Sequence, residues 1–261
     1  MSDYPWKSVL ITGASSGLGR ALAAVSAAPG VTLHLSGRDA ARLEDTATAC
    51  RALGASVATR VVSVTDAESM ADWIAQAGRL DLVIANAGIS GGTGDAVEPA
   101  AQAVRVFATN LTGVLNTALP AIEAMAAQAP GPDEVRGRVA VIASLAAFVA
   151  APGAPAYSAS KAAVQRWAEA LDASERKRGI RLHAICPGFI RTPMTASNPF
   201  AMPGLMTPEQ AARRTLAGIA AGRVRVAYPR PLYVMARLLG GLPPAWRNAM
   251  MRQVPAKPPQ S

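Results

Sequence analysis

The feature that most limits the fold of this chain is a regular alternation of short apolar runs and helical stretches. Apolar runs typical of strands cover residues 8–11, 31–36, 56–62, 80–85, 139–143, 181–186 and 224–227. Helical patterns lie between them, at residues 20–28, 40–53, 67–77, 100–128, 157–177 and 207–221. Such alternation indicates parallel pairing. With 261 residues, the chain is predicted to form one α/β domain, a doubly wound parallel sheet of about seven strands with helices on both faces.

A glycine-rich turn follows the first apolar run, with the sequence Thr12-Gly13-Ala14-Ser15-Ser16-Gly17-Leu18-Gly19, and a helical stretch comes after it. In this order of strand, turn and helix, glycines let the backbone approach a pyrophosphate at the helix N-terminus. A side chain at these positions would block that approach. The turn therefore predicts a dinucleotide site.

The second apolar run ends in Gly37 and Arg38, at the position where the ribose 2′ substituent of a dinucleotide is recognised. An acidic residue there accepts hydrogen bonds from the ribose hydroxyls of NAD, whereas a guanidinium matches a 2′-phosphate in charge and geometry. The alternative is that Arg38 is a solvated loop residue. We expect NADP(H) to be favoured over NAD(H).

Tyr157 and Lys161 stand four residues apart in a predicted helix, and Ser144 follows the fifth apolar run. Positions i and i+4 share a helix face, so the Lys161 ammonium is expected near the Tyr157 phenol. A phenol with a pKa of about 10 is a poor acid–base catalyst at neutral pH, and a nearby cation favours the phenolate. The Ser144 hydroxyl is suited to hold a substrate oxygen beside that phenol. The alternative is a surface helix with an unrelated Tyr and Lys.

The helical stretch at residues 100–128 contains Asn110-Leu111-Thr112-Gly113, although Asn and Gly both disfavour helix interiors. Residues that break a local rule often mark a functional site. Pro120 is a second position at which this stretch is expected to bend or divide.

Polar and glycine-containing segments follow several of the predicted strands. They are the glycine turn, Arg38, Asn86, Ser144 and residues 187–192. In doubly wound sheets, ligands bind beyond the carboxyl ends of the strands. These segments are therefore expected to meet at one edge of the sheet.

Over residues 7–228 the sequence resembles the short-chain dehydrogenase/reductase family. The matching motifs are TGASSGLG at 12–19, NAG at 86–88, NxxG at 110–113, Ser144, YSASK at 157–161 and PGxIxT at 187–192. The resemblance implies a Rossmann-type fold in which Tyr157 is the general acid in reduction and the base in oxidation. It implies that Ser144 orients the substrate carbonyl and that Lys161 lowers the pKa of Tyr157 and binds the nicotinamide ribose. Asn110 would sustain a water and proton relay while interrupting its helix.

The same resemblance implies a set of cofactor contacts. The glycines of the turn admit the pyrophosphate, Asn86 lies near the adenosine ribose, and Ile190 and Thr192 hold the carboxamide. The full set of implied cofactor-binding residues is Gly13, Ser15, Ser16, Gly17, Leu18, Gly19, Gly37, Arg38, Ser63, Val64, Asn86, Ala87, Gly88, Tyr157, Lys161, Pro187, Gly188, Ile190 and Thr192. Ser63 stands where the family usually has an adenine-contacting Asp, so this contact is expected to be weaker.

Residues 1–229 are predicted to form the catalytic domain, with a substrate-covering lid at residues 192–206. Residues 230–261 form a basic, Pro-containing extension that is expected to pack on the same domain or at an interface. Many family members instead end soon after the last strand, in a segment that helps to build a tetramer. We therefore expect a homo-oligomer, and a dimer rather than the usual tetramer.

The net charge of +9 comes entirely from the last fifth of the chain. Residues 1–209 contain 17 basic and 17 acidic side chains, whereas residues 210–261 contain nine basic ones and no acid. Apolar residues beside arginines, with Tyr233 and Trp246, suit an anionic lipid surface or an acidic carrier protein. The alternative is that the extension packs over the substrate pocket or a second subunit and exposes its arginines to water. No recognition motif accompanies the charge, so a nucleic-acid partner is not predicted.

Several features bear on the compartment. No apolar run reaches the roughly 18 residues needed to span a bilayer, and the N-terminus shows no basic-then-apolar signal. Cys50 and Cys186 offer no disulfide framework and no metal-ligand cluster. His34 and His183 lie in strand-like runs and are expected to pack in the core. We predict a cytoplasmic protein without a metal site, with a peripheral membrane contact as the alternative.

Together these patterns predict an NADPH-dependent oxidoreductase that reduces a small-molecule carbonyl to an alcohol, or catalyses the reverse reaction. The alternative is a non-catalytic dinucleotide-binding regulator or scaffold, which would keep the glycine turn and lose the tyrosine or the lysine. Both Tyr157 and Lys161 are present here.

Overall fold

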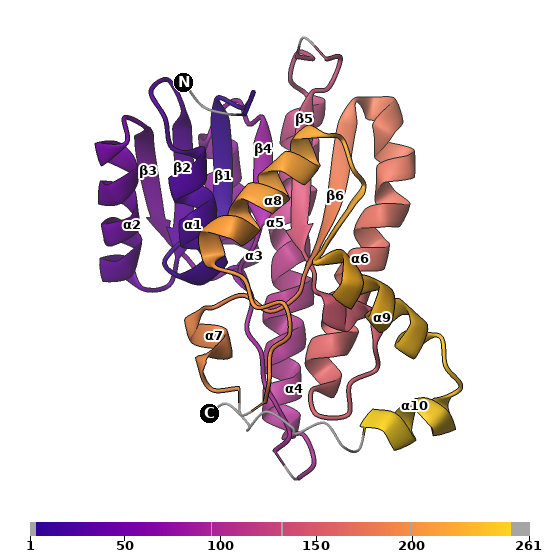
Figure 1. The fold of residues 1–261 in the computed structure, drawn as a ribbon. Coiled ribbons are helices and arrows are strands. Elements are labelled where there is room, and N and C mark those ends of the chain that lie inside the picture. The colour runs from indigo at the N-terminus through magenta and orange to yellow at the C-terminus, as the bar shows by residue number, and fades with distance from the viewer. Residues whose placement is uncertain (1–3, 95, 132, 199, 252–261) are drawn as a thin grey trace.

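Seven parallel strands form a single sheet in the computed structural model, which describes residues 4–94, 96–131, 133–198 and 200–251. The strands lie in the order β3-β2-β1-β4-β5-β6-β7, and every neighbouring pair is parallel (Figure 1). Their bounds are β1 Ser8–Thr12, β2 Thr32–Gly37, β3 Ser56–Val61, β4 Leu82–Ala85, β5 Gly137–Ile142, β6 Ile180–Pro187 and β7 Arg225–Tyr228. The predicted α/β fold with about seven strands is confirmed.

Helices cover both faces of this sheet (Figure 1). The α-helices are α1 Gly17–Ser26, α2 Ala40–Ala52, α3 Ala67–Gln76, α4 Ala100–Phe107, α5 Gly113–Ala126, α6 Pro155–Glu175, α7 Pro193–Ala196, α8 Pro208–Ala220, α9 Arg230–Gly240 and α10 Pro244–Met251. Short turns η2 and η3 occupy Leu145–Phe148 and Arg176–Arg178. The first helix begins three residues before its predicted start, because the last part of the glycine turn already has helical geometry.

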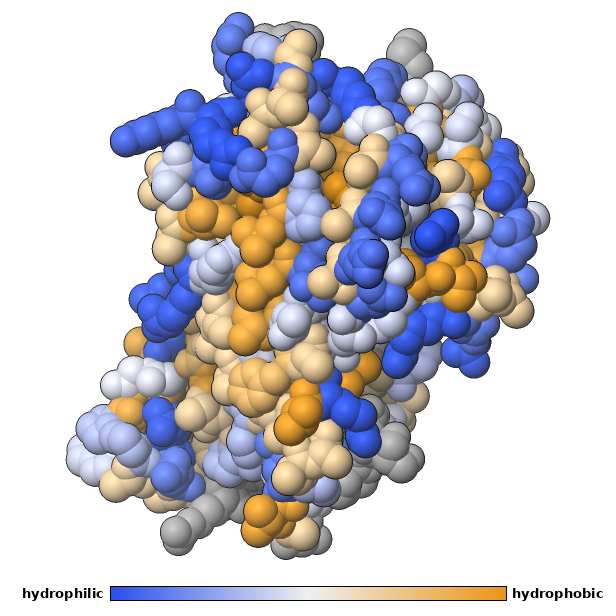
Figure 2. Space-filling model, turned by 180° about the vertical axis from the view of Figure 1, so that it is seen from behind, coloured by the Kyte–Doolittle hydropathy of each residue, from blue (hydrophilic) through white to orange (hydrophobic). Residues whose placement is uncertain are grey.

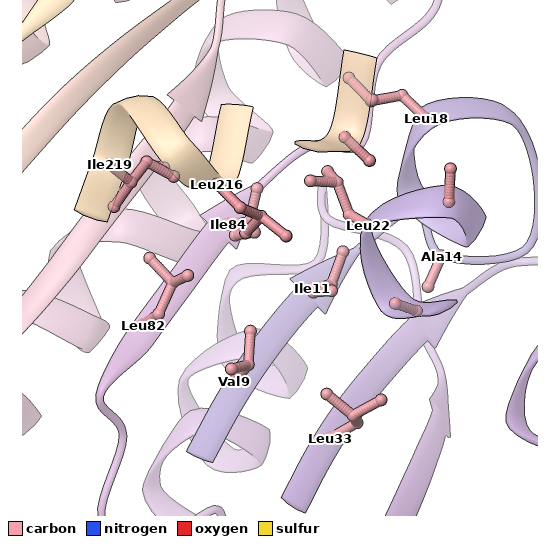
Figure 3. Close-up of a cluster of buried hydrophobic side chains, with 14 of the residues drawn as sticks. Val9, Ile11, Ala14, Leu18, Leu22, Leu33, Leu82, Ile84, Leu216 and Ile219 are labelled. Carbon is pink, nitrogen blue, oxygen red and sulfur yellow. The ribbon is translucent and has the colours of Figure 1, made fainter. Parts of the chain in front are cut away.

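The core has two layers, one on each side of the sheet. Alternate strand residues such as Val9 and Ile11 pack against Leu22 of α1 and Leu216 of α8 (Figure 3). Leu10, between them, points to the other side, where it joins the cluster formed with α3, α5 and α6. This alternation follows from the period of two along a strand, and full burial on both faces explains the nearly unbroken apolar runs.

The helical stretch predicted at residues 100–128 is interrupted, but not at Pro120. A π-helical turn, η1, occupies Ala108–Thr112 between α4 and α5, whereas Pro120 lies inside α5. Such turns widen a helix locally and are frequent at functional sites. The interruption therefore lies at Asn110, a residue type that disfavours helix interiors.

The C-terminal extension adds two helices to the sheet domain. Helix α9 follows β7 directly and packs against η2 and β7, and α10 comes after it (Figure 1). Residues 252–261 of the predicted extension lie outside the described residues.

The surface is unevenly polar. Seen from behind, apolar residues form a band down the middle, between hydrophilic flanks (Figure 2).

His34 and His183 are both buried, as are Cys50 and Cys186, so the expectation of core packing for the two histidines is confirmed. No helix among residues 4–94, 96–131, 133–198 and 200–251 has the length and apolar character that crossing a membrane requires.

Candidate active site

The glycine turn is fastened to the end of β4 by hydrogen bonds from Asn86. Its side-chain nitrogen donates to the carbonyl oxygens of Thr12 and Gly13, at 2.9 and 3.2 Å. The Thr12 hydroxyl oxygen in turn accepts from the backbone N–H groups of Asn86 and Ala87, at 3.0 and 3.1 Å. Asn86 therefore shapes the turn in addition to lining the pocket, a role that the sequence did not reveal.

Two glycines of the turn occupy places that no side chain fits. Gly13 has a φ of +66°, and a Cβ atom there would lie 2.8 Å from the Cα of Ala87. At Gly19 a Cβ atom would lie 2.2 Å from the carbonyl oxygen of Gly13. Contacts this short are forbidden, so the close approach of α1 to the end of β1 depends on glycine.

The N-terminus of α1 opens toward this turn. Ser16 is its N-cap, and the Ser16 side chain makes no capping hydrogen bond. The first backbone N–H groups of a helix have no partner inside the helix and favour an anion. The turn and helix end are thus chemically suited to a pyrophosphate, as the sequence predicts.

Asn110 is fully buried in the π-helical turn and joins two segments of the site. Its Oδ1 accepts from the backbone N–H of Ile89 at 2.8 Å, and its Nδ2 donates to the Ile89 carbonyl at 2.9 Å. The same Nδ2 donates to the hydroxyl of Ser160 at 3.2 Å. These hydrogen bonds from the Asn110 side chain to the main chain of Ile89 account for the departure from regular α-helical geometry at this point.

Ser144 and Tyr157 meet at the carboxyl end of β5. Ser144 follows that strand and accepts a hydrogen bond at Oγ from the Ala146 N–H, at 3.1 Å, which caps η2. Tyr157 stands in the first turn of α6 and is partly exposed to the pocket. Desolvation of its hydroxyl raises the pKa of Tyr157, and the hydrogen bond with Ser144 opposes that rise.

Lys161 is buried one turn farther along α6. Its Nζ donates to the carbonyl oxygen of Ile142 at 2.7 Å and lies 5.9 Å from the centre of the Tyr157 ring. A Cβ atom at Gly88 would lie 3.2 Å from Asn110 Oδ1 and 3.4 Å from Lys161 Nζ, so all three residues adjoin. Desolvation lowers the pKa of Lys161 to about 8, which leaves the amine mostly protonated at neutral pH.

These contacts correct one expectation about the pair. Lys161 lies on the same helix face as Tyr157, as predicted, but the pKa of Tyr157 is raised and not lowered. The lysine ammonium is directed to the Ile142 carbonyl, and Ser144 is the group whose hydrogen bond lowers the phenol pKa. The i, i+4 spacing predicts that the Tyr157 and Lys161 side chains share a helix face, but it does not show which group the Lys161 ammonium contacts.

Arg38 lies at the other end of the pocket and is exposed. Among the residues that the structure describes, no carboxylate pairs with it. The neighbouring Asp39 is engaged elsewhere, because it accepts from the backbone N–H of Arg42 at 3.1 Å and pairs with Nε of Arg42 at 3.3 Å. A Cβ atom at Gly37 would lie 3.0 Å from Ser15 Oγ, so a larger residue there would crowd the turn.

The segment after β6 also lines the pocket. Ile190 forms a parallel bridge with Met206, which joins the two ends of the predicted lid. Between them, Thr195 Oγ1 donates to the Ile190 carbonyl at 2.6 Å and Thr192 begins the short helix α7. Within the described part of the predicted lid at residues 192–206, α7 covers only Pro193–Ala196, and the rest has no helix or strand.

One cavity of about 440 Å³ joins these parts. It is lined by every predicted cofactor-binding residue and by Ser144, while Asn110 is buried behind it. The lining residues that the sequence interpretation missed are Ser36, Asp39, Arg42, Val62, Ile89, Thr109, Ile142 and Ala143, whereas Pro193, Met194 and Thr195 belong to the predicted lid. Most are chain neighbours of predicted residues, so their proximity to strand ends was the available signal. No cluster of metal-ligating side chains occurs in the described chain.

Comparison with known proteins agrees with this architecture. Residues 7–201 match the family model for short chain dehydrogenases. An uncharacterized oxidoreductase of Myxococcus xanthus is 35% identical over 258 residues, which is 97% of this chain and 100% of that protein.

Two solved structures resemble the fold at lower identity. A short chain dehydrogenase/reductase from Burkholderia phymatum, in complex with NAD, is 23% identical with a TM-score of 0.79, over 100% of both chains. A short-chain dehydrogenase from Sphingobium yanoikuyae, in complex with NADPH, is 24% identical with a TM-score of 0.78, over 95% of this chain and 96% of that one. The family-model match and the extent of the Myxococcus similarity show that this chain belongs to the short-chain dehydrogenase family of oxidoreductases.

Proposed function

We propose that this protein reduces a small-molecule carbonyl to an alcohol with NADPH. The observation that carries the proposal is the meeting of Ser144, Tyr157 and Lys161 at one end of a cavity whose other end contains Arg38. The glycine turn lines the same cavity, and the N-terminus of α1 beside it offers backbone N–H groups that suit a pyrophosphate. When bound, the nicotinamide cofactor supplies the hydride.

The residues of this chain handle the substrate oxygen and its proton. Ser144 orients the carbonyl, and the Tyr157 hydroxyl donates a proton to the oxygen as it becomes an alkoxide. Lys161 keeps a positive charge beside the reacting groups and binds the nicotinamide ribose. Asn110 holds the main chain around Ile89 and connects to Ser160, which supports a proton relay behind the tyrosine.

The neutral Tyr157 phenol carries the proton that reduction consumes, because the pKa of a phenol is well above 7. Oxidation would begin from the phenolate.

Turnover with NADPH distinguishes this proposal from a non-catalytic dinucleotide-binding regulator. We expect steady NADPH oxidation, followed at the absorbance of the reduced nicotinamide, with at least one member of a panel of ketones, acyl thioesters, steroids and nucleotide sugars. Binding of NADPH without consumption across the whole panel would favour the regulator. The panel also identifies the substrate class.

The preference for NADPH rests on the contacts around Arg38. Its guanidinium is exposed in the pocket, while the carboxylate of the neighbouring Asp39 caps α2 and pairs with Arg42. Because the two solved relatives contain NAD in one case and NADPH in the other, the fold serves either cofactor and this end of the pocket makes the choice.

Replacing Arg38 by Asp is expected to raise the KM for NADPH by about 10- to 100-fold, because a charge-assisted hydrogen bond to the 2′-phosphate is lost and a repulsion replaces it. The KM for NADH should change much less. Steady-state kinetics with both cofactors measure the difference, and R51Q, at an exposed arginine of α2 outside the cavity lining, serves as the control. Equal increases for both cofactors, or an equal effect of R51Q, would contradict the assignment to Arg38.

A further inference from the structure

Helix α9 packs on the domain through only one of its faces. The Tyr233 ring meets the Phe148 ring edge to face, with centroids 5.1 Å apart, and its hydroxyl accepts from Arg225 Nη1 at 2.8 Å. Ala236, one turn later, is buried. Arg225 also pairs with Glu169 of α6, so this face ties the extension to the helix that carries Tyr157.

The opposite face of α9 is apolar and exposed. Val234, Met235 and Leu238 are 53%, 54% and 70% exposed, and their spacing places them along one side of the helix. A helix that is apolar on both sides is normally covered on both. The outer face of α9 therefore has the character of a contact surface.

Helix α10, which follows α9 in the chain, also exposes large apolar side chains. Trp246 and Met250, one turn apart, are 68% and 58% exposed. Exposed large hydrophobic side chains of the described residues are therefore concentrated in α9 and α10, although these two helices are short. Tryptophan is enriched at boundaries between water and lipid, where its ring is apolar and its N–H polar.

The charge of this region selects an anionic partner. Arg230, Arg237 and Arg247 lie in the two helices, and the sequence contains no acidic residue after Glu209. Basic side chains flanking an apolar face, with an exposed Trp, are the composition of helices that lie in the plane of a membrane interface.

We propose that α9 and α10 form a peripheral docking surface for membranes that contain anionic phospholipid. An acidic protein would neutralise the arginines but would also have to match and bury large apolar side chains on two helices. A lipid interface accepts both kinds of group without a matching shape. Because α9 packs against η2, the turn that Ser144 caps, docking would hold this part of the domain close to the lipid.

Vesicle sedimentation tests this proposal with the full-length protein. We expect binding to vesicles of phosphatidylcholine and phosphatidylglycerol in equal parts, and much weaker binding to phosphatidylcholine alone. Rising salt should weaken the binding, because it screens the attraction of the arginines for the surface. Trp246 supplies a second readout, since it is far more exposed than the buried Trp6 and Trp73 and the partly buried Trp167, and its emission should shift to shorter wavelength on the anionic vesicles.

Matched substitutions distinguish vesicle binding through this surface from a general effect of the protein's charge. L238E should lower the affinity for the mixed vesicles by about tenfold or more. L53E adds the same charge at another exposed leucine, the C-cap residue of α2, and should have a much smaller effect. Replacing Arg230 and Arg237 by Gln should weaken binding by about fivefold for each charge removed.

Three results would overturn the proposal. One is equal binding of wild type and L238E to the mixed vesicles. Another is a concentration-dependent dimer, abolished by L238E, with no vesicle binding, which would assign the surface to a second copy. The third is binding to an acidic acyl carrier protein in place of vesicles. Reduction of a water-soluble carbonyl by L238E should equal that of wild type, so failure of the docking surface and failure of the proposed activity are distinguishable.

Discussion

Replacing Tyr157 by Phe is expected to lower kcat for NADPH-dependent carbonyl reduction by about 10²- to 10⁴-fold, the usual contribution of a positioned general acid. The change removes the hydroxyl that bonds to Ser144 and leaves the ring in place. Affinity for NADPH should stay close to that of wild type, because the glycine turn and Arg38 are untouched. Stopped-flow or steady-state kinetics measure kcat, and the fluorescence of NADPH on titration measures binding.

Tyr233 provides the matched control for this experiment. It is also a tyrosine with a hydrogen-bonded hydroxyl, but its partner is Arg225 and it lies outside the cavity lining. Y233F should therefore retain most of the wild-type kcat. If Y157F reduced carbonyls as fast as wild type, the proton donor would have to be another group.

Replacing Gly19 by Ala is expected to have the largest effect on both stability and cofactor binding. The added methyl group would lie 2.2 Å from the Gly13 carbonyl oxygen and 2.6 Å from Asn86 Nδ2. Moving either atom would disturb the hydrogen bond between them, which holds the turn against the end of β4. Overpacking of this kind costs about 1–3 kcal/mol in the free energy of unfolding, which corresponds to a fall in Tm of roughly 2–10 °C.

The same displacement should distort the pyrophosphate cradle, so NADPH affinity is expected to fall together with Tm. Differential scanning fluorimetry with and without NADPH measures both effects. Gly241 is a suitable control, since it has a φ of −80° and a Cβ atom there meets nothing closer than 3.5 Å. G241A should behave like wild type. A Gly19→Ala protein with unchanged Tm and unchanged NADPH affinity would show that the turn can relax, contrary to this argument.

The sheet and its ligand edge could be predicted because their determinants are local. Apolar runs and helical periods mark the elements, and each strand end exposes its next few residues at the same edge. This reasoning placed Arg38, Asn86 and Ser144 in one pocket before any geometry was known. It also singled out Asn110, because an Asn inside a helical pattern conflicts with helix propensity.

The contacts that depend on side-chain direction could not be predicted in this way. The bond from Lys161 to the Ile142 carbonyl spans the chain from α6 to β5, and nothing in the YSASK motif indicates it. The two bonds from Asn86 into the glycine turn likewise join segments 73 and 74 residues apart. The boundaries of helices also differ by a few residues, because local hydrogen bonds at helix ends decide where they begin.

The order of the strands has a consequence for the synthesis of this protein. β1 lies between β2 and β4, so one of its edges finds a partner as soon as β2 is made, while the other waits until residues 82–85 have left the ribosome. Throughout that interval the nascent chain carries an apolar strand edge without a neighbour, a state that invites association with other chains. Ser144, Tyr157 and Lys161 come later still. Incomplete chains therefore pass through an aggregation-prone stage before they possess the residues of the proposed reaction.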